Sequence, residues 1–512
     1  MLPPHAKRSN ILTLLETRGE ANHENVRAVA RETGVPEADI WGVASFYHLV
    51  RHVPHRVCTG LSCQISGADD LLESLRQKAA EKGDQLPEPV SCLGQCDRPV
   101  AQLDGHHEPI GPKTKTNVTP DDQELPFNLG GVDDCSYSAL KKVESSGIEF
   151  AMKELIASGL QGRGGAGFPA HIKWLAVKES DSQTKYVVCN ADEAEPGTFK
   201  DREVMLRRPH LVLEGLAIAA LTVGAMEIHI YVRGAFGACR RALEGALEEA
   251  QESLSNFSFV FTSGHGAYIC GEETALLESI EGKRGMPRLK PPFPTDFGLY
   301  GQPSLIHNVE SLAAIPTIMT RGGEWFKAKG KTGAGTKLYC ISGHIKRPGV
   351  YELPLGASLA ELIEVSGGAE GKLIAFSPGG ASSGFLPISY QDTPMDFKSL
   401  SEAGSMLGSA GVVVLNDTVD IARVTLRQLE FFEAESCGQC APCRLGSRVL
   451  SQAVARYIET NSKEELAHVA EVAWEMEEGS ICGLGIAAPL PLTSALKHFP
   501  EAFSGDKTGL NQ

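Results

Sequence analysis

Length, charge and hydropathy exclude several classes of protein. The chain has 512 residues, which at about 150 residues per domain predicts three to four domains. Acidic residues outnumber basic ones by 64 to 48, for a formal net charge of −16, which argues against a nucleic-acid-binding protein because such proteins carry a basic surface. The longest apolar stretch, residues 215–226, is too short to span a bilayer, and Glu16 ends the apolar run near the start. We therefore expect a globular protein of the cytoplasm, without a membrane span.

The 13 cysteines form two tight groups and a scattered remainder. The N-terminal group is Cys58, Cys63, Cys92 and Cys96, and the C-terminal group is Cys437, Cys440, Cys443 and Cys482. A long chain without a secretory signal has little use for disulfides, so clustered thiols indicate bound metal. We interpret the scattered ones as small buried apolar residues: Cys135, Cys189, Cys239, Cys270 and Cys340.

The first part of the chain predicts helices followed by a small mixed domain. Residues 1–50 carry apolar side chains at helical spacing. In residues 51–115, strand patterns lead into both cysteine pairs, an amphipathic helix fits 67–82, and a further strand fits 100–103. Polar residues rich in Pro, Asp and Thr come next, and we place a linker at 116–139.

The rest of the chain predicts three more domains. In residues 140–335, strands and helices alternate, which predicts a mostly parallel sheet. The strand patterns lie at 186–189, 228–233 and 257–261, and the helical ones at 203–226, 238–254 and 272–281. Residues 336–416 begin with two strands around a tight turn and continue with a helix at 359–365. Residues 417–512 are predicted to be helical. The fold class is therefore α/β with several domains.

The C-terminal cysteines have the most specific spacing, C-x2-C-x2-C with a distant fourth at Cys482. Three thiolates within seven residues can surround one side of a compact cluster, and soft thiolates select iron–sulfur clusters or zinc. Spacing favours a [4Fe–4S] cluster over a four-cysteine zinc site, which more often uses two separated pairs. The N-terminal C-x4-C and C-x3-C pairs suit [2Fe–2S] or zinc, and the spacing leaves both open.

Three further segments could bind a ligand. Residues 162–167 match G-x-G-x-x-G, but a helical pattern precedes them where a dinucleotide fingerprint needs a strand. The acidic segment 190–197 directly follows a predicted strand, where open α/β sheets bind ligands, and Gly271-Glu272-Glu273 starts a predicted helix. Each acidic segment on its own is more often a solvated turn or helix start. Lys290-Pro291-Pro292-Phe293 is a stiff segment with one charge and one ring.

Taken together, these motifs resemble the NADH-binding flavin subunit of respiratory complex I and its relatives. The resemblance rests on GLQGRGGAGFP (159–169), CNADEAEPGTFKDR (189–202), GAYICGEETALLESIEGKRG (266–285), KPPFP (290–294) and ESCGQCAPCRLG (435–446). The N-terminal part, with GVASFY (42–47) and its four cysteines, is similar to that complex's small thioredoxin-like [2Fe–2S] subunit. The chain therefore looks like a fusion of the two subunits.

The resemblance implies a thioredoxin-like [2Fe–2S] domain at 51–115 and a Rossmann-like FMN- and NAD-binding domain at 140–335. It further implies a β-grasp (ubiquitin-like, SLBB-like) domain at 336–416 and a helical [4Fe–4S] bundle at 417–512. The residues implied to surround FMN are Gly162, Arg163, Gly164, Gly165, Lys173, Asn190, Asp192, Glu193, Gly271, Glu272, Glu273 and Asn308. Those implied to face NAD are Phe168, Glu195, Tyr268, Lys290 and Phe293. His307 departs from the pattern, because the family usually has a second Asn there.

The implied chemistry needs no side-chain nucleophile. A hydride carries two electrons and each iron–sulfur cluster takes one, so a flavin is the converter between them. We expect Glu193 and Glu195 to position ligands rather than react, and the protein to act as an NADH:acceptor oxidoreductase (diaphorase) subunit.

The partner is a separate question. PGGASSGFLP (378–387) and KHFPEAF (497–503) most resemble the β subunit of NAD-dependent molybdenum or tungsten formate dehydrogenase, whose catalytic subunit is then the expected partner. The alternatives are the diaphorase subunit of an NAD-reducing hydrogenase or a complex I-like NADH dehydrogenase. A zinc-stapled assembly protein, which would be colourless, is the non-enzyme alternative.

Overall fold

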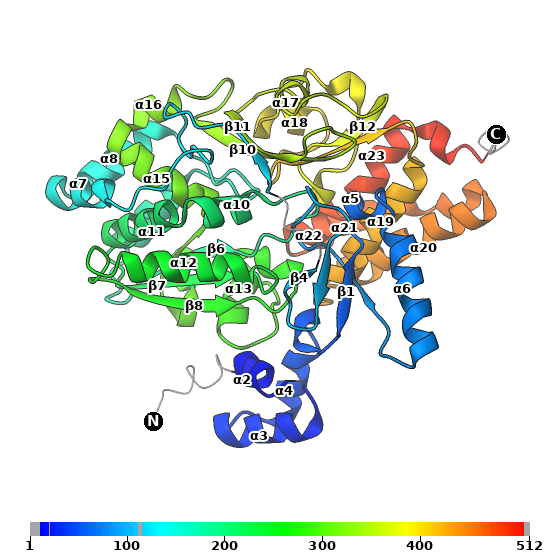
Figure 1. Ribbon diagram of the computed structural model, residues 1–512, viewed down its shortest axis with the longest axis horizontal. Coiled ribbons are helices and arrows are strands. Elements are labelled where there is room, and N and C mark those ends of the chain that lie inside the picture. Colours follow the sequence, from blue (N-terminus) through cyan, green and yellow to red (C-terminus); the bar gives the residue numbers. More distant parts are fainter. Residues whose placement is uncertain (1–10, 20, 111–114, 506–512) are drawn as a thin grey trace.

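The computed structural model describes residues 11–19, 21–110 and 115–505 and confirms the predicted fold class (Figure 1). The chain starts with three short helices, α2 (Ile11–Thr17), α3 (His23–Thr33) and α4 (Glu37–Ala44). Asn22 caps α3 by accepting the backbone N–H of Asn25, and Gly34 ends that helix with a left-handed φ of 75°. None of the described helices is both long and apolar enough to cross a membrane.

A four-stranded sheet of order β2-β1-β3-β4 forms the thioredoxin-like domain. Its strands are β1 (His55–Cys58), β2 (Glu88–Val90), β3 (Gln102–Asp104) and β4 (Pro109–Ile110). The parallel pair β1 and β2 is connected through α5 (Leu61–Gln64) and α6 (Ala68–Lys82), where the amphipathic pattern predicted a helix. The predicted strand at 100–103 begins two residues later, at Gln102.

The central sheet is parallel throughout, with order β8-β7-β6-β9. Its strands are β6 (Tyr186–Ala191), β7 (Glu227–Val232), β8 (Ser258–Ser263) and β9 (Ser304–Asn308). The helices around it are α7 (Ser138–Ser146), α8 (Ile148–Ser158), α9 (Ala170–Glu179), α10 (Lys200–Arg207), α11 (Pro209–Val223), α12 (Gly237–Glu249), α13 (Glu273–Ile280), α14 (Pro294–Phe297), α15 (Val309–Arg321) and α16 (Gly323–Lys327). The predicted helix 203–226 is wrong as one element: α10 and α11 are separated at Arg208, because Pro209 starts a new helix at its first position.

Helix α11 is buried on nearly every side and packs against α15. Gly215 lies directly against the carbonyl oxygen of Leu312, and a Cβ atom there would overlap it. The glycine therefore permits the close helix crossing that supports the sheet.

The β-grasp domain contains a six-stranded sheet of order β13-β12-β14-β10-β11-β5, at the top of Figure 1. Its strands are β10 (Thr336–Gly343), β11 (Gly349–Pro354), β12 (Leu373–Ser377), β13 (Leu386–Pro387), β14 (Gly411–Asn416) and β5 (Asn117–Val118), with helices α17 (Leu359–Val365) and α18 (Phe397–Glu402). Strand β5 belongs to the segment expected as a linker, yet it pairs with β11. That segment is thus partly ordered against the β-grasp sheet.

The C-terminal domain is helical, as predicted, with α19 (Ile421–Glu435), α20 (Ala441–Thr460), α21 (Val469–Gly479), α22 (Gly483–Ala487) and α23 (Leu490–His498). Short 3-10 helices complete the fold: η1 (His48–Val50), η2 (Tyr268–Gly271), η3 (Leu299–Gly301), η4 (Ala381–Ser383), η5 (Ile388–Tyr390), η6 (Lys463–Leu466) and η7 (Pro500–Phe503). Helix α22 packs on both α20 and α21, which brings the distant Cys482 back to the other three cysteines of its group.

Candidate functional site

The carboxyl edge of the central sheet brings three predicted motifs together. Strands β6 and β9 are neighbours, and their register pairs Asn190 with Asn308. The side-chain amide of Asn190 donates to the carbonyl of Gly271 at 2.8 Å, which adds the third motif. Asn308 is also the N-cap of α15, because its Oδ1 accepts the backbone N–H of Glu310 at 3.0 Å. The predicted position of a ligand site at this edge therefore has a geometric basis.

The glycine-rich loop follows helix α8 rather than a strand, as the sequence predicted. Its Arg163 backbone N–H donates to Ser311 Oγ at 2.8 Å, which fixes the loop over the start of α15. A Cβ at Gly164 would lie 3.0 Å from Asn308 Cβ, whereas a Cβ at Gly165 would meet nothing within 4 Å. The loop thus closes against Asn308 on one side and leaves an open side where a flat ring or phosphate could approach.

Two buried polar groups near these motifs lack protein partners. The guanidinium of Arg163 donates to the carbonyl of Ala334 at 2.6 Å, but its Nε and Nη1 have no partner among the described residues. Asp192 Oδ2 is likewise buried without a partner in the described part of the chain, and burial raises the pKa of Asp192 to about 7. Unpaired buried donors and acceptors beside an open glycine loop fit a polar, anionic cofactor such as FMN.

The side chain of Glu193 accepts hydrogen bonds from the protein backbone. Its carboxylate accepts the N–H groups of Asp201 at 2.8 Å and Arg202 at 3.0 Å, at the start of α10. Burial, and next the neighbouring Asp201 charge, raise the pKa of Glu193. The resemblance implied that Glu193 lies beside FMN; in the structure its carboxylate also caps α10, which fixes the acidic loop that carries it.

Two lysines converge on the acidic start of α13. Lys173 on α9 lies 2.7 Å from Glu273, and Lys290 lies 2.8 Å from Glu272 and 3.0 Å from Glu273. Burial opposes ionisation of Glu273, but the charges of Lys173 and Lys290 dominate and lower its pKa. Glu272 also caps α13 by accepting from Thr274 and Ala275. The structure therefore joins four of the predicted site residues in one charged cluster.

Two exposed aromatic rings are close in the chain to the residues of this cluster. Phe168 follows the glycine-rich loop and Phe293 follows Lys290, and they are 47% and 51% exposed. Exposed rings and partly exposed charges suit a ligand that carries flat bases and phosphates. The Tyr268 hydroxyl donates to the Glu195 carboxylate, so two of the residues predicted to face NAD are in contact.

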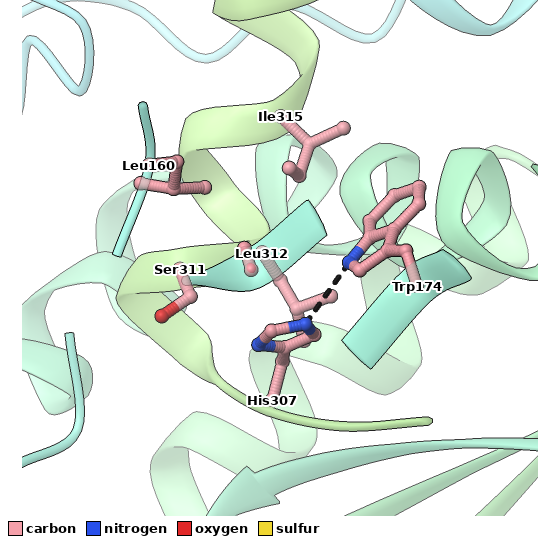
Figure 2. Close-up of a pocket in the computed structure, with 7 residues that line it drawn as sticks. Leu160, Trp174, His307, Ser311, Leu312 and Ile315 are labelled. Carbon is pink, nitrogen blue, oxygen red and sulfur yellow. Dashed lines mark hydrogen bonds between the residues drawn. The ribbon is translucent and has the colours of Figure 1, made fainter. Parts of the chain in front are cut away.

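His307, which stands where the family usually has a second Asn, forms a hydrogen bond with a buried tryptophan. Figure 2 shows it beside Trp174, whose indole N–H donates to His307 Nε2 at 2.9 Å. An indole nitrogen can only donate, so Nε2 is unprotonated and the proton of the neutral ring is on Nδ1. Burial, and next the charge of Lys173, lower the pKa of His307 to about 3. His307 is therefore a neutral side chain that packs under the glycine-rich loop.

Lys200 is a site residue that sequence reasoning missed. Its ammonium group lies 2.6 Å from Asp201, 3.1 Å from Glu310 and 3.2 Å from Asn308 Oδ1. Burial opposes its charge, but Asp201 and Glu310 raise its pKa. Lys200 belongs to the CNADEAEPGTFKDR motif, so the sequence resemblance already included it. Nothing in the sequence indicated that its ammonium group contacts Asn308.

The N-terminal thiols are buried together and are free of disulfides. Cys92 Sγ lies 3.7 Å from Cys96 Sγ, and proximity to Cys63 and Cys92 raises the pKa of Cys58. Backbone N–H groups point at the sulfurs: Gly94 to Cys92 at 3.4 Å, Ala101 to Cys63 at 3.5 Å and Gly197 to Cys96 at 3.3 Å. Four gathered thiols with N–H donors around them fit an iron–sulfur cluster.

The C-terminal thiols lie at helix starts. Cys440 is the N-cap of α20 and Cys482 is the N-cap of α22, while Cys443 is buried in the first turn of α20. Burial raises the pKa of Cys443 to about 12, and the other three thiols lie close enough to contribute to the increase. Gly485 permits the close packing, because a Cβ there would lie 2.9 Å from Cys443 Cβ. The donor set fits a [4Fe–4S] cluster at this position.

Glu435 joins both cysteine groups to the nucleotide side of the site. Its Oε1 accepts the hydroxyl of Ser91 at 2.5 Å, next to Cys92, and its Oε2 accepts the backbone N–H of Tyr268 at 2.9 Å. Because Glu435 lies two residues before Cys437, one carboxylate connects three segments that were predicted separately.

Comparison with known proteins decides the family. The second of the NADH-quinone oxidoreductase F subunits of Rhizobium meliloti (strain 1021) is 46% identical over 396 residues, covering 74% of this chain and 92% of that protein. The chain belongs to the family of NADH-quinone oxidoreductase F subunits. The F subunit of Rickettsia felis is 44% identical over 375 residues, covering 70% of this chain and 89% of its own length.

Four family models match successive parts of the chain. They are a thioredoxin-like [2Fe–2S] ferredoxin at 4–120, the Nuo51 FMN-binding domain at 155–317, an SLBB domain at 338–385 and the NADH-ubiquinone oxidoreductase-F iron-sulfur binding region at 423–505. The chain is thus an NADH-oxidising subunit with an FMN-binding domain, a [2Fe–2S] domain and a [4Fe–4S] region. The zinc alternative that spacing left open is not supported.

Solved structures resemble the chain over nearly its whole length. An NAD+-reducing [NiFe]-hydrogenase in the H2-reduced state has a chain with a TM-score of 0.90 and 26% identity, covering 98% of this chain and 94% of that one. The air-oxidised state of such a hydrogenase gives a TM-score of 0.89 with 27% identity, covering 96% of this chain and 93% of that one.

Proposed function

We propose that the chain is the NAD(H)-reacting β subunit of an NAD-dependent formate dehydrogenase, in which formate and NAD+ give CO2 and NADH. The observation that carries the diaphorase part is the single edge of the central sheet at which the glycine-rich loop, the acidic loops and Asn308 meet. The formate dehydrogenase part is supported by the resemblance of residues 378–387 and 497–503 to β subunits of that enzyme. The partner is then a molybdenum- or tungsten-containing catalytic subunit.

The proposed division of the site follows its geometry. FMN would be held by the open side of Gly165, by Asn190 and Asn308 at the sheet edge, and by Lys173 beside Glu273. The dinucleotide would lie between Phe168 and Phe293 at the rim and Glu195 and Tyr268 further in, with Lys290 beside it. When bound, FMN supplies the exchange of an electron pair with NAD(H) and of single electrons with iron–sulfur clusters. The residues around it orient the two ligands and exclude water.

The proposed exit for electrons is the C-terminal domain. Three of its four clustered cysteines are only partly buried. Exposed apolar side chains lie on the helices that carry or adjoin these cysteines. These side chains are Leu445 and Val449 on α20, Trp474 on α21 and Ile486 on α22, with Leu445 60% and Trp474 64% exposed. We call this group the exit patch. Large apolar side chains that are exposed together typically mark a protein interface, and we propose that this group forms the interface with the catalytic partner.

An NAD-reducing hydrogenase is the second candidate, favoured by one observation. The two NADH-quinone oxidoreductase relatives cover 70–74% of this chain, whereas the hydrogenase chain covers 98% of it, including the thioredoxin-like domain. The hydrogenase chain therefore has the thioredoxin-like domain and the flavin-subunit domains in one polypeptide, as this chain does.

Purification of the chain from its own host with a small affinity tag tests the proposal. We expect a co-purifying subunit with molybdopterin and molybdenum or tungsten, and NAD+ reduction that depends on formate. Nickel in the complex with H2-dependent NAD+ reduction would instead establish the hydrogenase candidate. Transfer from NADH to quinone with neither metal would contradict both.

A further inference from the structure

A loop of the β-grasp domain reaches the dinucleotide side of the site. The loop connects β12 to β13 and contains η4. The backbone N–H of Ser382 donates to Glu195 Oε1 at 2.8 Å, and its hydroxyl donates to Glu195 Oε2 at 3.1 Å. The Tyr268 hydroxyl donates to the same Oε2 and lies 3.2 Å from Ser382 Oγ. Two of the three donors to Glu195 thus come from a residue 187 positions away in the sequence.

Hydrogen bonds within the loop fix its shape. Ser377 and Ser383 both donate to the carbonyl of Gly380, at 2.6 Å and 2.7 Å, and Gly379 donates to Ser383 Oγ at 2.9 Å. Gly380 has a φ of 89°, and a Cβ there would lie 2.5 Å from Glu195 Cγ and 2.7 Å from its Oε1. Only glycine permits this approach, so the loop is built to lie directly on Glu195.

We propose that Ser382 is a positioning residue of the dinucleotide site, which sets the direction of the Glu195 carboxylate. Oε1 accepts one donor and Oε2 accepts two, which fixes the plane of the carboxylate, and Oε1 retains a lone pair for a further donor from a ligand. The inference rests on the proposed function, because only there does Glu195 face the dinucleotide. It makes the β-grasp domain part of NAD(H) recognition.

A purely structural role predicts different behaviour. If Ser382 only fastens the β-grasp domain to the sheet, its removal lowers thermal stability and leaves dinucleotide affinity unchanged. If it positions Glu195, its removal weakens dinucleotide binding while the turnover rate at saturation stays the same, because the transfer itself occurs at the flavin.

The experiment uses the full-length, flavin-loaded chain and compares Ser382→Ala with Ser382→Thr, which keeps the hydroxyl. The equilibrium Kd for NAD+ is measured by calorimetry, KM and kcat for NADH with ferricyanide, and Tm by scanning calorimetry. Because the backbone N–H remains, we expect Ser382→Ala to raise Kd and KM about three- to tenfold at nearly constant kcat, and Ser382→Thr to restore both. Ser389→Ala, at an exposed serine of the same domain, is the matched control. If the alanine variant does not fold, Ser382→Cys gives the same test, because a cysteine is nearly the same size as serine but a much weaker hydrogen-bond donor.

A double-mutant cycle with Glu195→Gln separates the inference from the proposed function. Ser382→Ala should lose most of its effect on Kd in the Glu195→Gln background. If Glu195→Gln weakens NAD+ binding but Ser382→Ala changes only Tm, the positioning role is overturned and the proposed function stands. If Glu195→Gln itself leaves the Kd for NAD+ unchanged, the assignment of Glu195 to the dinucleotide is wrong, and the proposed site fails with it.

Discussion

Gly197 donates its backbone N–H to the sulfur of Cys96 at 3.3 Å, so the acidic loop after β6 directly touches the N-terminal thiol group. The same loop carries Glu195 toward Tyr268. Arg233 also reaches from the central domain to the carbonyl of Cys92. Hydrogen bonds to sulfur and nearby charges are the means by which proteins tune iron–sulfur clusters. The residues around the [2Fe–2S] cluster therefore come from the nucleotide-binding domain as well as from the thioredoxin-like domain.

The isolated chain should oxidise NADH without any partner subunit. All residues proposed to bind FMN or to position the dinucleotide, Ser382 included, belong to this one chain, and an artificial acceptor such as ferricyanide can take electrons from the site. The measurement is NADH-dependent ferricyanide reduction, with flavin-depleted protein as the control. A flavin-loaded preparation whose absorbance NADH fails to bleach would be incompatible with the site.

A charge in the exit patch should block transfer to the partner and spare the NADH reaction. Trp474→Glu and Leu445→Glu place a charge in a proposed apolar interface, where a central residue typically contributes about 2 kcal/mol or more to binding. We expect partner-linked turnover to fall at least about tenfold at unchanged NADH:ferricyanide activity. Val132, which is 90% exposed elsewhere, provides the control Val132→Glu. Equal loss in the control and the patch variants would refute the interface.

Trp174→Phe should destabilise the protein through His307. The change leaves the buried Nε2 of His307 without its donor, which typically costs about 1–3 kcal/mol of unfolding free energy. Urea unfolding of the flavin-free protein measures the loss, and Trp474→Phe, at an exposed indole, is the control. No difference between the two variants would show that the hydrogen bond in Figure 2 contributes nothing to stability.

Glu214 should make stability decrease with rising pH. Its buried carboxyl accepts from the N–H groups of Ala139 and Leu140, and burial raises its pKa from 4.5 to about 7. The folded state therefore binds the proton more tightly than the unfolded state, so this contribution is full below pH 4.5 and is lost as pH rises toward 7. Glu214→Gln, which keeps an acceptor, should flatten the decrease in Tm over this window relative to Glu252→Gln at an exposed site. If Tm decreases with pH as steeply in Glu214→Gln as in the unmodified protein, the Glu214 carboxyl is not the cause of the decrease.

Elements with strong local signals were predictable. Strands β6, β7 and β8 lie within a few residues of their expected positions, because each is an apolar run bounded by polar turns. The break at Arg208 was missed because the charged residues around it have good helix propensity and hide the effect of Pro209. Strand β5 was missed because a two-residue edge strand has no pattern of its own and gains its stability from β11, far along the chain.

The candidate site was predictable as motifs but not as contacts. The sequence placed Asn190, Glu195 and the glycine-rich loop near one edge, because they follow strands or match a known family. It could not show that Glu193 caps α10, or that Ser382 reaches Glu195, since both depend on how separate domains pack. Serines are common in loops, so only the folded structure distinguishes Ser382 from its neighbours.

The most direct test of the electron path compares Cys443→Ser with Cys96→Ser in the reconstituted complex, because the two changes damage different clusters. Serine is a harder and less readily ionised ligand than cysteine, so each change should remove or alter one cluster. Electron paramagnetic resonance counts the clusters while formate-dependent NAD+ reduction is followed. Cys443→Ser should lose the [4Fe–4S] signal and stop partner-linked turnover while NADH still reduces the flavin, and Cys96→Ser should lose only the [2Fe–2S] signal with partial turnover. Retention of both clusters and full turnover in Cys443→Ser would contradict the account, because Cys437, Cys440, Cys443 and Cys482 would then not be the ligand set.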